Sequence, residues 1–125
     1  MSPKKLSEMT YIDVNVIYYY LTAHEKYGKK SKAHIEVHGG KLVTSTLTVW
    51  LLHVLTRLEN LAAIMRDVGI NLSSLTSGIL SDAEALDEPK DLEDRIHLST
   101  MKYLGINRII SNDSDFDLPG VERIF

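Results

Sequence analysis

The stretch Arg108-Ile109-Ile110-Ser111-Asn112-Asp113-Ser114-Asp115-Phe116-Asp117 joins an apolar run to a polar turn with three acids at alternate positions. The two isoleucines are typical of a buried strand, and the turn follows them directly. In open α/β sheets, ligands bind beyond the carboxyl ends of the strands. A strand that ends in several carboxylates therefore predicts a cation site, and we expect other parts of the chain to bring further acids to the same place.

The composition fits a globular protein of 125 residues, which we interpret as one domain over residues 1–125. Hydrophobic residues make up 44% and charged residues 25%, which argues against a disordered chain. The absence of cysteine excludes disulfides and thiolate metal sites. No apolar run is long enough to span a bilayer, and Met1–Glu8 lacks the apolar middle of a signal peptide. We therefore expect a cytoplasmic protein with no membrane partner.

The net charge of −3 gives no global support for nucleic-acid binding, because such proteins usually present a basic surface. Lysines nevertheless gather at Lys4–Lys5 and at positions 26, 29, 30 and 32. A cluster of active-site acids would itself make the net charge negative, so the overall charge does not exclude a nucleic acid as partner. His34 and His38 have the spacing of metal ligands, but no third ligand is nearby, and we interpret them as part of a solvated face.

Asp13 follows a second predicted strand. Met9–Ile12 is β-prone, and the apolar segment after Asp13, from Val14 to Leu21, is predicted to be a helix. Asp13 would thus lie at the carboxyl end of a strand. The alternative interpretation is that Asp13 only caps the helix, because Asp is a favoured N-cap residue.

Asp94 lies on the apolar side of a third predicted element, a helix from Asp91 to Leu104. Asp94 precedes Leu98 by four residues and shares its helical stripe with Met101. Burying an unpaired charge is costly, and a cation would supply the missing partner. The alternative is a first-turn acid that is stabilised by the helix dipole and by the cap.

The remaining segments complete an alternation of helices and strands. We expect a polar helix over 24–38, a strand over 41–45, the longest helix over 48–68, short helices or turns over 71–90, and strands over 106–110 and 121–125. This order predicts a three-layer α/β/α architecture, in which a mostly parallel sheet has helices on both faces. The apolar stripe of the long helix is wide and includes Trp50, which indicates that part of it faces a partner subunit.

Four acids are the candidate catalytic and metal-binding residues: Asp13, Asp94, Asp113 and Asp115. In a parallel sheet with right-handed crossovers, the carboxyl ends of the strands share one edge. Carboxylates that meet there raise each other's pKa, and a hard divalent cation such as Mg²⁺ relieves their repulsion. Such a site suits phosphodiester hydrolysis, in which one metal activates water and another stabilises the leaving oxygen.

Three segments resemble the PIN domain family, and specifically the small ribonuclease toxins of the VapC type. Tyr11–Ile17 looks like the first strand and acid of the family, Glu93–Thr100 looks like its DAxHLAT helix, and Ile109–Phe116 looks like its hhTNDxDF ending. The resemblance implies a Rossmann-like sheet, usually in a homodimer, and Mg²⁺- or Mn²⁺-dependent endoribonuclease activity. It also implies an antitoxin protein as a partner, which would mask the site.

The same resemblance assigns roles to residues by position. Asp13, Asp94 and Asp113 correspond to the core acids of the family, and Asp115 corresponds to the fourth. Ser111 and Asn112 occupy the polar positions that orient the cluster.

Leu51 departs from the family pattern. The family usually has a Glu early in the helix after the second strand, about two turns past a Ser that corresponds to Ser45. The nearest Glu is Glu59, about two further turns along the chain, and His53, Glu93 or a water is a candidate substitute. The alternative function is therefore a catalytically weak or silent PIN-like module that binds RNA or protein, and a third is a pure interaction protein.

Overall fold

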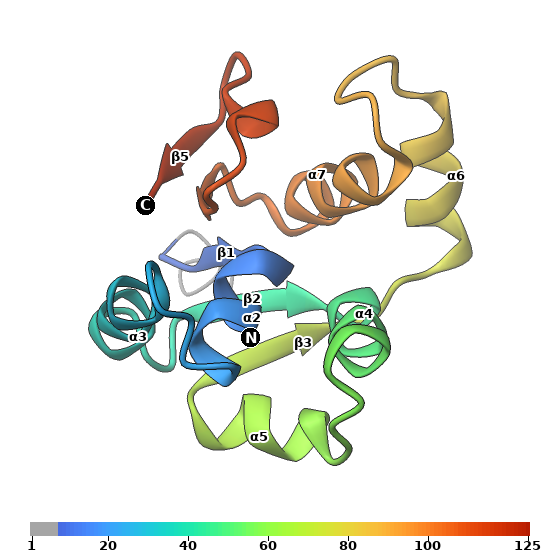
Figure 1. The fold of residues 1–125 in the computed structure, drawn as a ribbon. Helices are drawn as coiled ribbons and strands as arrows, with labels where there is room; N and C mark the ends of the chain where they lie inside the picture. Colours follow the sequence, from blue (N-terminus) through green and yellow to red (C-terminus); the bar gives the residue numbers. More distant parts are fainter. Residues whose placement is uncertain (1–7) are drawn as a thin grey trace.

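A five-stranded sheet runs through the molecule in the order β3-β2-β1-β4-β5 (Figure 1). The computed structural model describes residues 8–125. All four neighbouring pairs of strands are parallel. The predictions for residues 1–7, including most of the segment used against a signal peptide and the pair Lys4–Lys5, lie outside the described residues. The strands are β1 (Thr10–Ile12), β2 (Leu42–Ser45), β3 (Ile70–Ser73), β4 (Arg108–Ile110) and β5 (Glu122–Ile124).

Helices cover both faces of this sheet, as the alternation of elements predicted (Figure 1). One face packs against α2, α3, α4 and α5 through a core that includes Ile12 and Ile110. The other face packs against α7 through a core that includes Tyr11 and Ile109, and α6 lies against α7. Neighbouring strand residues thus point to opposite layers, as the pleat requires. The helices are α2 (Val14–Leu21), α3 (Gly28–Val37), α4 (Thr46–Thr56), α5 (Leu61–Asp67), α6 (Ser77–Ala85) and α7 (Leu92–Leu104), and a 3₁₀ turn, η1, spans Ser114–Phe116.

The strand order reverses between β1 and β4. From β1 the chain moves outward to β2 and β3, and it then returns to place β4 on the other side of β1. At such a switch point the connections leave the sheet toward opposite faces, which opens a crevice at the carboxyl ends of the strands. β1 ends immediately before Asp13 and β4 ends immediately before Ser111, so the topology brings these two segments together.

The prediction of a single helix over 48–68 is wrong, because two helices, α4 and α5, occupy this segment. The axes of α4 and α5 differ by 117°, and Arg57 and Asn60 adopt left-handed backbone conformations with φ of 61° and 60°. Side chains close the break: Thr56 Oγ1 accepts a hydrogen bond from the Leu58 N–H at 3.1 Å. Apolar residues on both sides kept the helical spacing and concealed the bend. Among residues 8–125, no single helix is long and apolar enough to cross a membrane, although the bent pair α4–α5 passes on length and composition taken together.

The prediction of short helices or turns over 71–90 missed the edge strand β3. Only Ile70 of this strand is buried, so the segment shows neither an apolar run nor a clean alternation. The helical part of the prediction is confirmed by α6, which begins at Ser77 after the Thr76 side chain caps its first turn. The predicted helix over 91–104 is confirmed by α7, with Asp91 as N-cap and Gly105 closing the helix in a left-handed conformation.

Candidate metal centre

Asp13 is held rigidly between β1 and β4. It is 2% exposed, its Oδ1 accepts the backbone N–H of Val14 at 2.8 Å, and its Oδ2 accepts the Ser111 hydroxyl at 2.7 Å. Burial raises the pKa of Asp13 to about 6, and the charges of Glu93 and Asp113 act in the same direction. Asp13 therefore does cap α2, as the alternative interpretation held. Its Oδ1 caps the helix, while its Oδ2 is bonded to Ser111, which directly follows β4.

Asp94 points inward from the first turn of α7, on the apolar stripe where the spacing placed it. It is 5% exposed, and no basic side chain within residues 8–125 forms an ion pair with it. The pKa of Asp94 is raised to about 7, mainly by burial and in addition by the negative charges of Asp113 and Asp13. A buried acid whose nearest charged neighbours are other acids is the environment that a cation would relieve.

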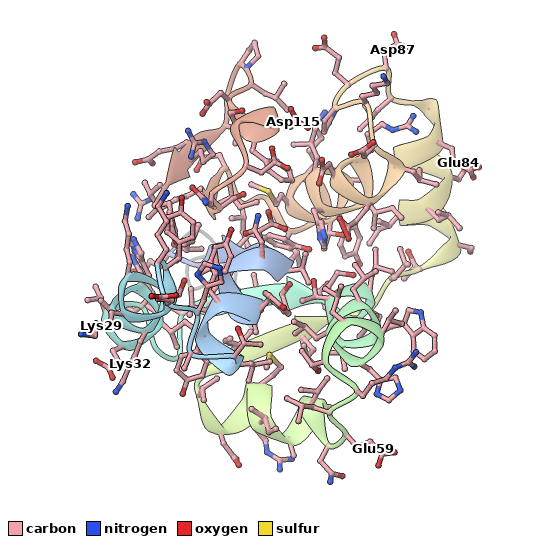
Figure 2. The ribbon with its side chains drawn as sticks, viewed as in Figure 1. Lys29, Lys32, Glu59, Glu84, Asp87 and Asp115 are labelled. Carbon is pink, nitrogen blue, oxygen red and sulfur yellow. The ribbon has the colours of Figure 1, made fainter. Side chains whose placement is uncertain are left out.

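Asp113 and Asp115 reach the site through a tight turn, in which Asp113 precedes η1 and Asp115 lies within it. Asp113 Oδ1 accepts the Asp115 N–H at 2.9 Å and caps η1, while the Asp113 N–H donates to Ser111 Oγ at 3.0 Å. Ser111 thus links the backbone of Asp113 to the carboxylate of Asp13. Asp115 lies on η1, on the side of the sheet that α7 covers (Figure 2).

Three carboxylates come within reach of a single ion at this place. One oxygen each of Asp91, Asp94 and Asp115 lies within 4.8 Å of the other two. Asp91 is exposed and occupies the N-cap position of α7, but its side chain makes no capping bond. The nearby acids Asp82, Glu84 and Asp87 are also exposed, and Figure 2 shows Glu84 and Asp87 pointing outward.

Glu93 is a further acid that the sequence assigned only as a candidate substitute. It is half-buried, and its pKa is raised mainly by burial and in addition by the negative charges of Asp91 and Asp113. Its charge also contributes to the raised pKa values of Asp13 and Asp94. The signal in the sequence was the density of acids at 91, 93 and 94, which equally fits acids attracted to a helix N-terminus.

Asp117, the last acid of the opening stretch, does not join the cluster. The Arg123 guanidinium donates two hydrogen bonds to its carboxylate, at 2.8 and 3.1 Å, and holds the pKa of Asp117 below its usual value. Arg123 also donates to the Ser111 carbonyl at 3.1 Å. The same arginine therefore braces the end of β4 from the side of β5.

Two buried side chains, Tyr11 and His97, lie next to Asp13 in the interior of the protein. The Tyr11 hydroxyl lies 2.6 Å from His97 Nδ1 and accepts the Ser45 N–H at 3.1 Å. Burial lowers the pKa of His97 to about 4, so this ring is neutral near pH 7. Its Nε2 lies 4.0 Å from Asp13 Oδ1, too far for a hydrogen bond. His97 therefore lies next to Asp13 in the interior without neutralising the charge of its carboxylate.

No acid from α4 reaches this group in the described structure. Leu51 is partly buried and packs against the core between the sheet and α2–α5. His53 lies in the last turn of α4, and its Nδ1 is 2.9 Å from the Leu58 carbonyl oxygen in the α4–α5 connection. Glu59 is exposed in the α4–α5 connection, at the opposite end of the molecule from Asp115 (Figure 2). Of the substitutes considered from the sequence, only Glu93 lies with the acids.

The donor set fits a hard divalent cation. All of the converging side chains offer carboxylate oxygens, which Mg²⁺ and Mn²⁺ prefer over nitrogen or sulfur. Burial is the main cause of the raised pKa values of Asp13 and Asp94, and the negative charges of neighbouring carboxylates raise them further. The candidate ligands are Asp13, Asp91, Glu93, Asp94, Asp113 and Asp115.

Comparison with known proteins gives a family and a fold. The family model of the PIN domain matches residues 10–121. A toxin–antitoxin complex from Klebsiella pneumoniae superposes with a TM-score of 0.70 at 20% identity, over 90% of this chain and 94% of that one. VapC20 of Mycobacterium tuberculosis, described as a Sarcin-Ricin loop cleaving toxin, gives 0.68 at 16% identity, over 86% and 92%.

A third similar structure is VapBC2 of Rickettsia felis, bound to a DNA fragment from its promoter. It gives a TM-score of 0.64 at 10% identity, over 93% of this chain and 97% of that one. At these identities the three structures establish the fold. A comparison with curated protein sequences gives no significant match.

Proposed function

The chain belongs to the PIN domain family, and we propose that it is a divalent-metal-dependent endoribonuclease. The observation that carries this proposal is the convergence of acids at the switch point of the sheet: oxygens of Asp91, Asp94 and Asp115 lie within 4.8 Å of one another, and Ser111 links Asp13 to Asp113. Oxygen-only donors beside a crevice favour a cation that binds phosphate. Similarity to VapC20, a toxin that cleaves the Sarcin-Ricin loop, supports RNA as the substrate class.

The protein residues would divide the work as follows. Asp94, Asp115 and Asp91 would hold a cation between α7 and η1. Asp13 and Asp113 would contribute carboxylate ligands from the side of β1 and β4. Bound Mg²⁺ or Mn²⁺ would supply an activated water and charge neutralisation at the scissile phosphate.

Orientation of these acids would come from neighbouring polar groups. Ser111 fixes the rotamer of Asp13 and the backbone of Asp113 through its two hydrogen bonds. Asn112 lies between Ser111 and Asp113, and its own position is fixed by the hydrogen bond that its Nδ2 donates to the Tyr19 hydroxyl at 3.3 Å. A preorganised ligand set of this kind avoids reorganisation when the cation and the phosphate arrive.

The proposal includes protein partners. A toxin–antitoxin complex and a VapBC complex are among the similar structures, which supports an antitoxin as a binding partner. Exposed apolar side chains on α4 and after it support a protein interface, in line with the expected homodimer: Trp50, Val54, Leu55 and Leu58.

The test is a Mn²⁺ titration by calorimetry with RNA cleavage measured in parallel, on the wild type and on Asp94→Asn and Asp113→Asn. We expect each variant to lose Mn²⁺ binding and to lower cleavage on the order of a hundredfold or more. Asp87→Asn is the matched control, because Asp87 is exposed and points away from the crevice (Figure 2). Cleavage by Asp113→Asn at the wild-type rate would refute the proposal.

Leu51 favours a second candidate, a PIN-like module that binds RNA or protein without cleaving it. The partly buried leucine removes the carboxylate that α4 usually contributes in the family. Wild-type protein that binds RNA but neither binds Mn²⁺ nor cleaves would support this candidate over the nuclease.

A further inference from the structure

An aromatic surface lies beside the crevice, where α2, α3 and the end of β5 meet. We call Tyr19, Tyr27, His34 and Phe125 the aromatic ridge. The ring of Tyr27 lies 5.0 Å from that of Tyr19 and 5.6 Å from that of Phe125, and His34 stacks on Phe125 at 5.7 Å. All four side chains are partly exposed. Phe125 also packs against the core, so the ridge is fixed to the sheet.

The ridge carries the basic side chains of the chain's most lysine-rich segment. Lys26 Nζ lies 5.2 Å from the centroid of the Tyr27 ring, and Lys30 Nζ lies 4.5 Å from that of Phe125. Within residues 8–125, neither lysine forms an ion pair, whereas Lys32 pairs with Glu36 at 3.9 Å. Figure 2 shows Lys29 and Lys32 projecting from α3 away from the body of the protein. This concentration of positive charge contrasts with a chain whose net charge is −3.

Asn112 connects the ridge to the acids. Asn112 directly precedes Asp113 and donates a hydrogen bond to the Tyr19 hydroxyl at 3.3 Å. The ridge therefore begins one residue from a candidate metal ligand and extends from there over α3.

We propose that the aromatic ridge, with Lys26 and Lys30, binds the single-stranded part of an RNA substrate and guides its backbone into the acidic crevice. Bases would stack on Tyr27 and Phe125, and the two lysine side chains would move from the ring faces to the neighbouring phosphates. This inference names the substrate-binding surface of the proposed nuclease, and to that extent it rests on the proposed function.

The chemistry of the surface favours single-stranded nucleic acid over the other classes of partner. Stacking on exposed aromatic rings requires unpaired bases, which a duplex does not offer. Positive side chains between aromatic rings are the usual combination in grooves that follow a single strand. A protein partner would be better served by the apolar side chains of Trp50, Val54 and Leu55 on α4, which have no comparable charge among them.

The first experiment measures binding of a short fluorescein-labelled single-stranded RNA by anisotropy, in EDTA so that cleavage does not contribute. Lys26→Gln/Lys30→Gln should weaken binding about tenfold at low salt and reduce the slope of log affinity against log salt by about 1.4, or about 0.7 for each lost phosphate contact. Arg66→Gln/Lys102→Gln is the matched control, because it removes the same charge from exposed positions on α5 and α7. The control should change affinity by less than about twofold.

A second pair of variants tests stacking. Tyr27→Ala should weaken single-strand binding about 5- to 150-fold, whereas Tyr27→Phe should retain it, because stacking requires the ring and not the hydroxyl. Thermal unfolding of each variant excludes loss of the fold as the cause. Duplex RNA should bind more weakly than the single strand and should respond to the lysine changes but not to Tyr27→Ala.

Failure of this inference and failure of the nuclease proposal give different results. Wild-type protein that cleaves RNA, with the same KM in the lysine and control variants, would overturn the ridge and leave the nuclease intact. Protein that does not cleave but binds the single strand with the expected dependence would keep the ridge and refute the nuclease. Loss of binding to a protein partner in the ridge variants, with unchanged RNA affinity, would overturn the inference in favour of a protein-docking surface.

Discussion

Asp13→Asn should stabilise the metal-free protein at pH 8. Asp13 is 2% exposed and its pKa is raised to about 6 in the folded state, from 3.8 for an unperturbed Asp. Between these values the folded protein binds more protons than the unfolded chain. The free energy of unfolding therefore falls as the pH rises through this interval, and the loss is complete somewhat above pH 6. An amide at this position carries no charge and escapes this cost.

The magnitude follows from the difference between the two pKa values. A change from 3.8 to about 6 corresponds to about 3 kcal/mol at pH 8, since one pKa unit is about 1.4 kcal/mol. Part of this gain is offset, because the Ser111 hydroxyl now donates to Asp13 Oδ2 and an amide nitrogen there cannot accept it. We therefore expect a net stabilisation of about 1–3 kcal/mol at pH 8 and none, or a small loss, near pH 4.

The assay is urea unfolding of wild type and Asp13→Asn in EDTA across this pH range, and then in excess Mn²⁺. The order of stability should reverse in Mn²⁺, because only the wild type should gain from binding, by about 4.1 kcal/mol at a thousandfold excess of free metal over Kd. A well-folded variant that is no more stable than the wild type at pH 8 in EDTA would refute the electrostatic reasoning. A variant that gains as much from Mn²⁺ as the wild type would remove Asp13 from the ligand set.

Three further predictions concern single positions. Leu51→Glu should raise Mn²⁺ affinity about tenfold over Leu51→Gln in calorimetry, because a carboxylate adds both a ligand and a charge where the family usually has one; equal affinities would mean that this position does not reach the ion. Tyr11→Phe should cost about 1–3 kcal/mol in urea unfolding, since the Ser45 N–H and His97 Nδ1 lose their buried partner, and an unchanged midpoint would contradict that role. Asn60→Val should be about 1–2 kcal/mol less stable than Asn60→Gly, because φ is 60° there; similar stabilities would show that the α4–α5 break is not constrained at this residue.

The sequence predicted the parts of the fold that local chemistry determines. Asp13 and the run from Ile109 to Asp113 each combine a strand with the residue that ends it, and both strands are present at the expected places. The helix from Leu92 to Leu104 has a favoured cap at one end and a glycine with φ of 72° at the other. Such signals act within a few residues, so they can be found without knowing the tertiary structure.

The errors occurred where tertiary contacts overrode the local pattern. Residues 48–68 satisfy helical spacing throughout, but after the bend at Thr56 both α4 and α5 pack into the core on the same face of the sheet. β3 contributes one buried residue, Ile70, and its strand conformation comes from pairing with β2 rather than from its own pattern. Neither effect leaves a periodicity that a window of residues can detect.

The acids show the same division between local and tertiary information. Asp94 could be found because an acid on an apolar stripe conflicts with its neighbours, and such conflicts are expected at functional sites. Asp91 and Glu93 conflict with nothing, because acids are favoured in the first turn of any helix. Their place in the cluster depends on η1 approaching the start of α7, which brings Asp115 within 4.8 Å of Asp91 and Asp94. If the cation site tolerates the leucine at position 51, the replacement charge therefore comes from the start of α7, and removing Glu93 should weaken Mn²⁺ binding more than removing the exposed Glu84.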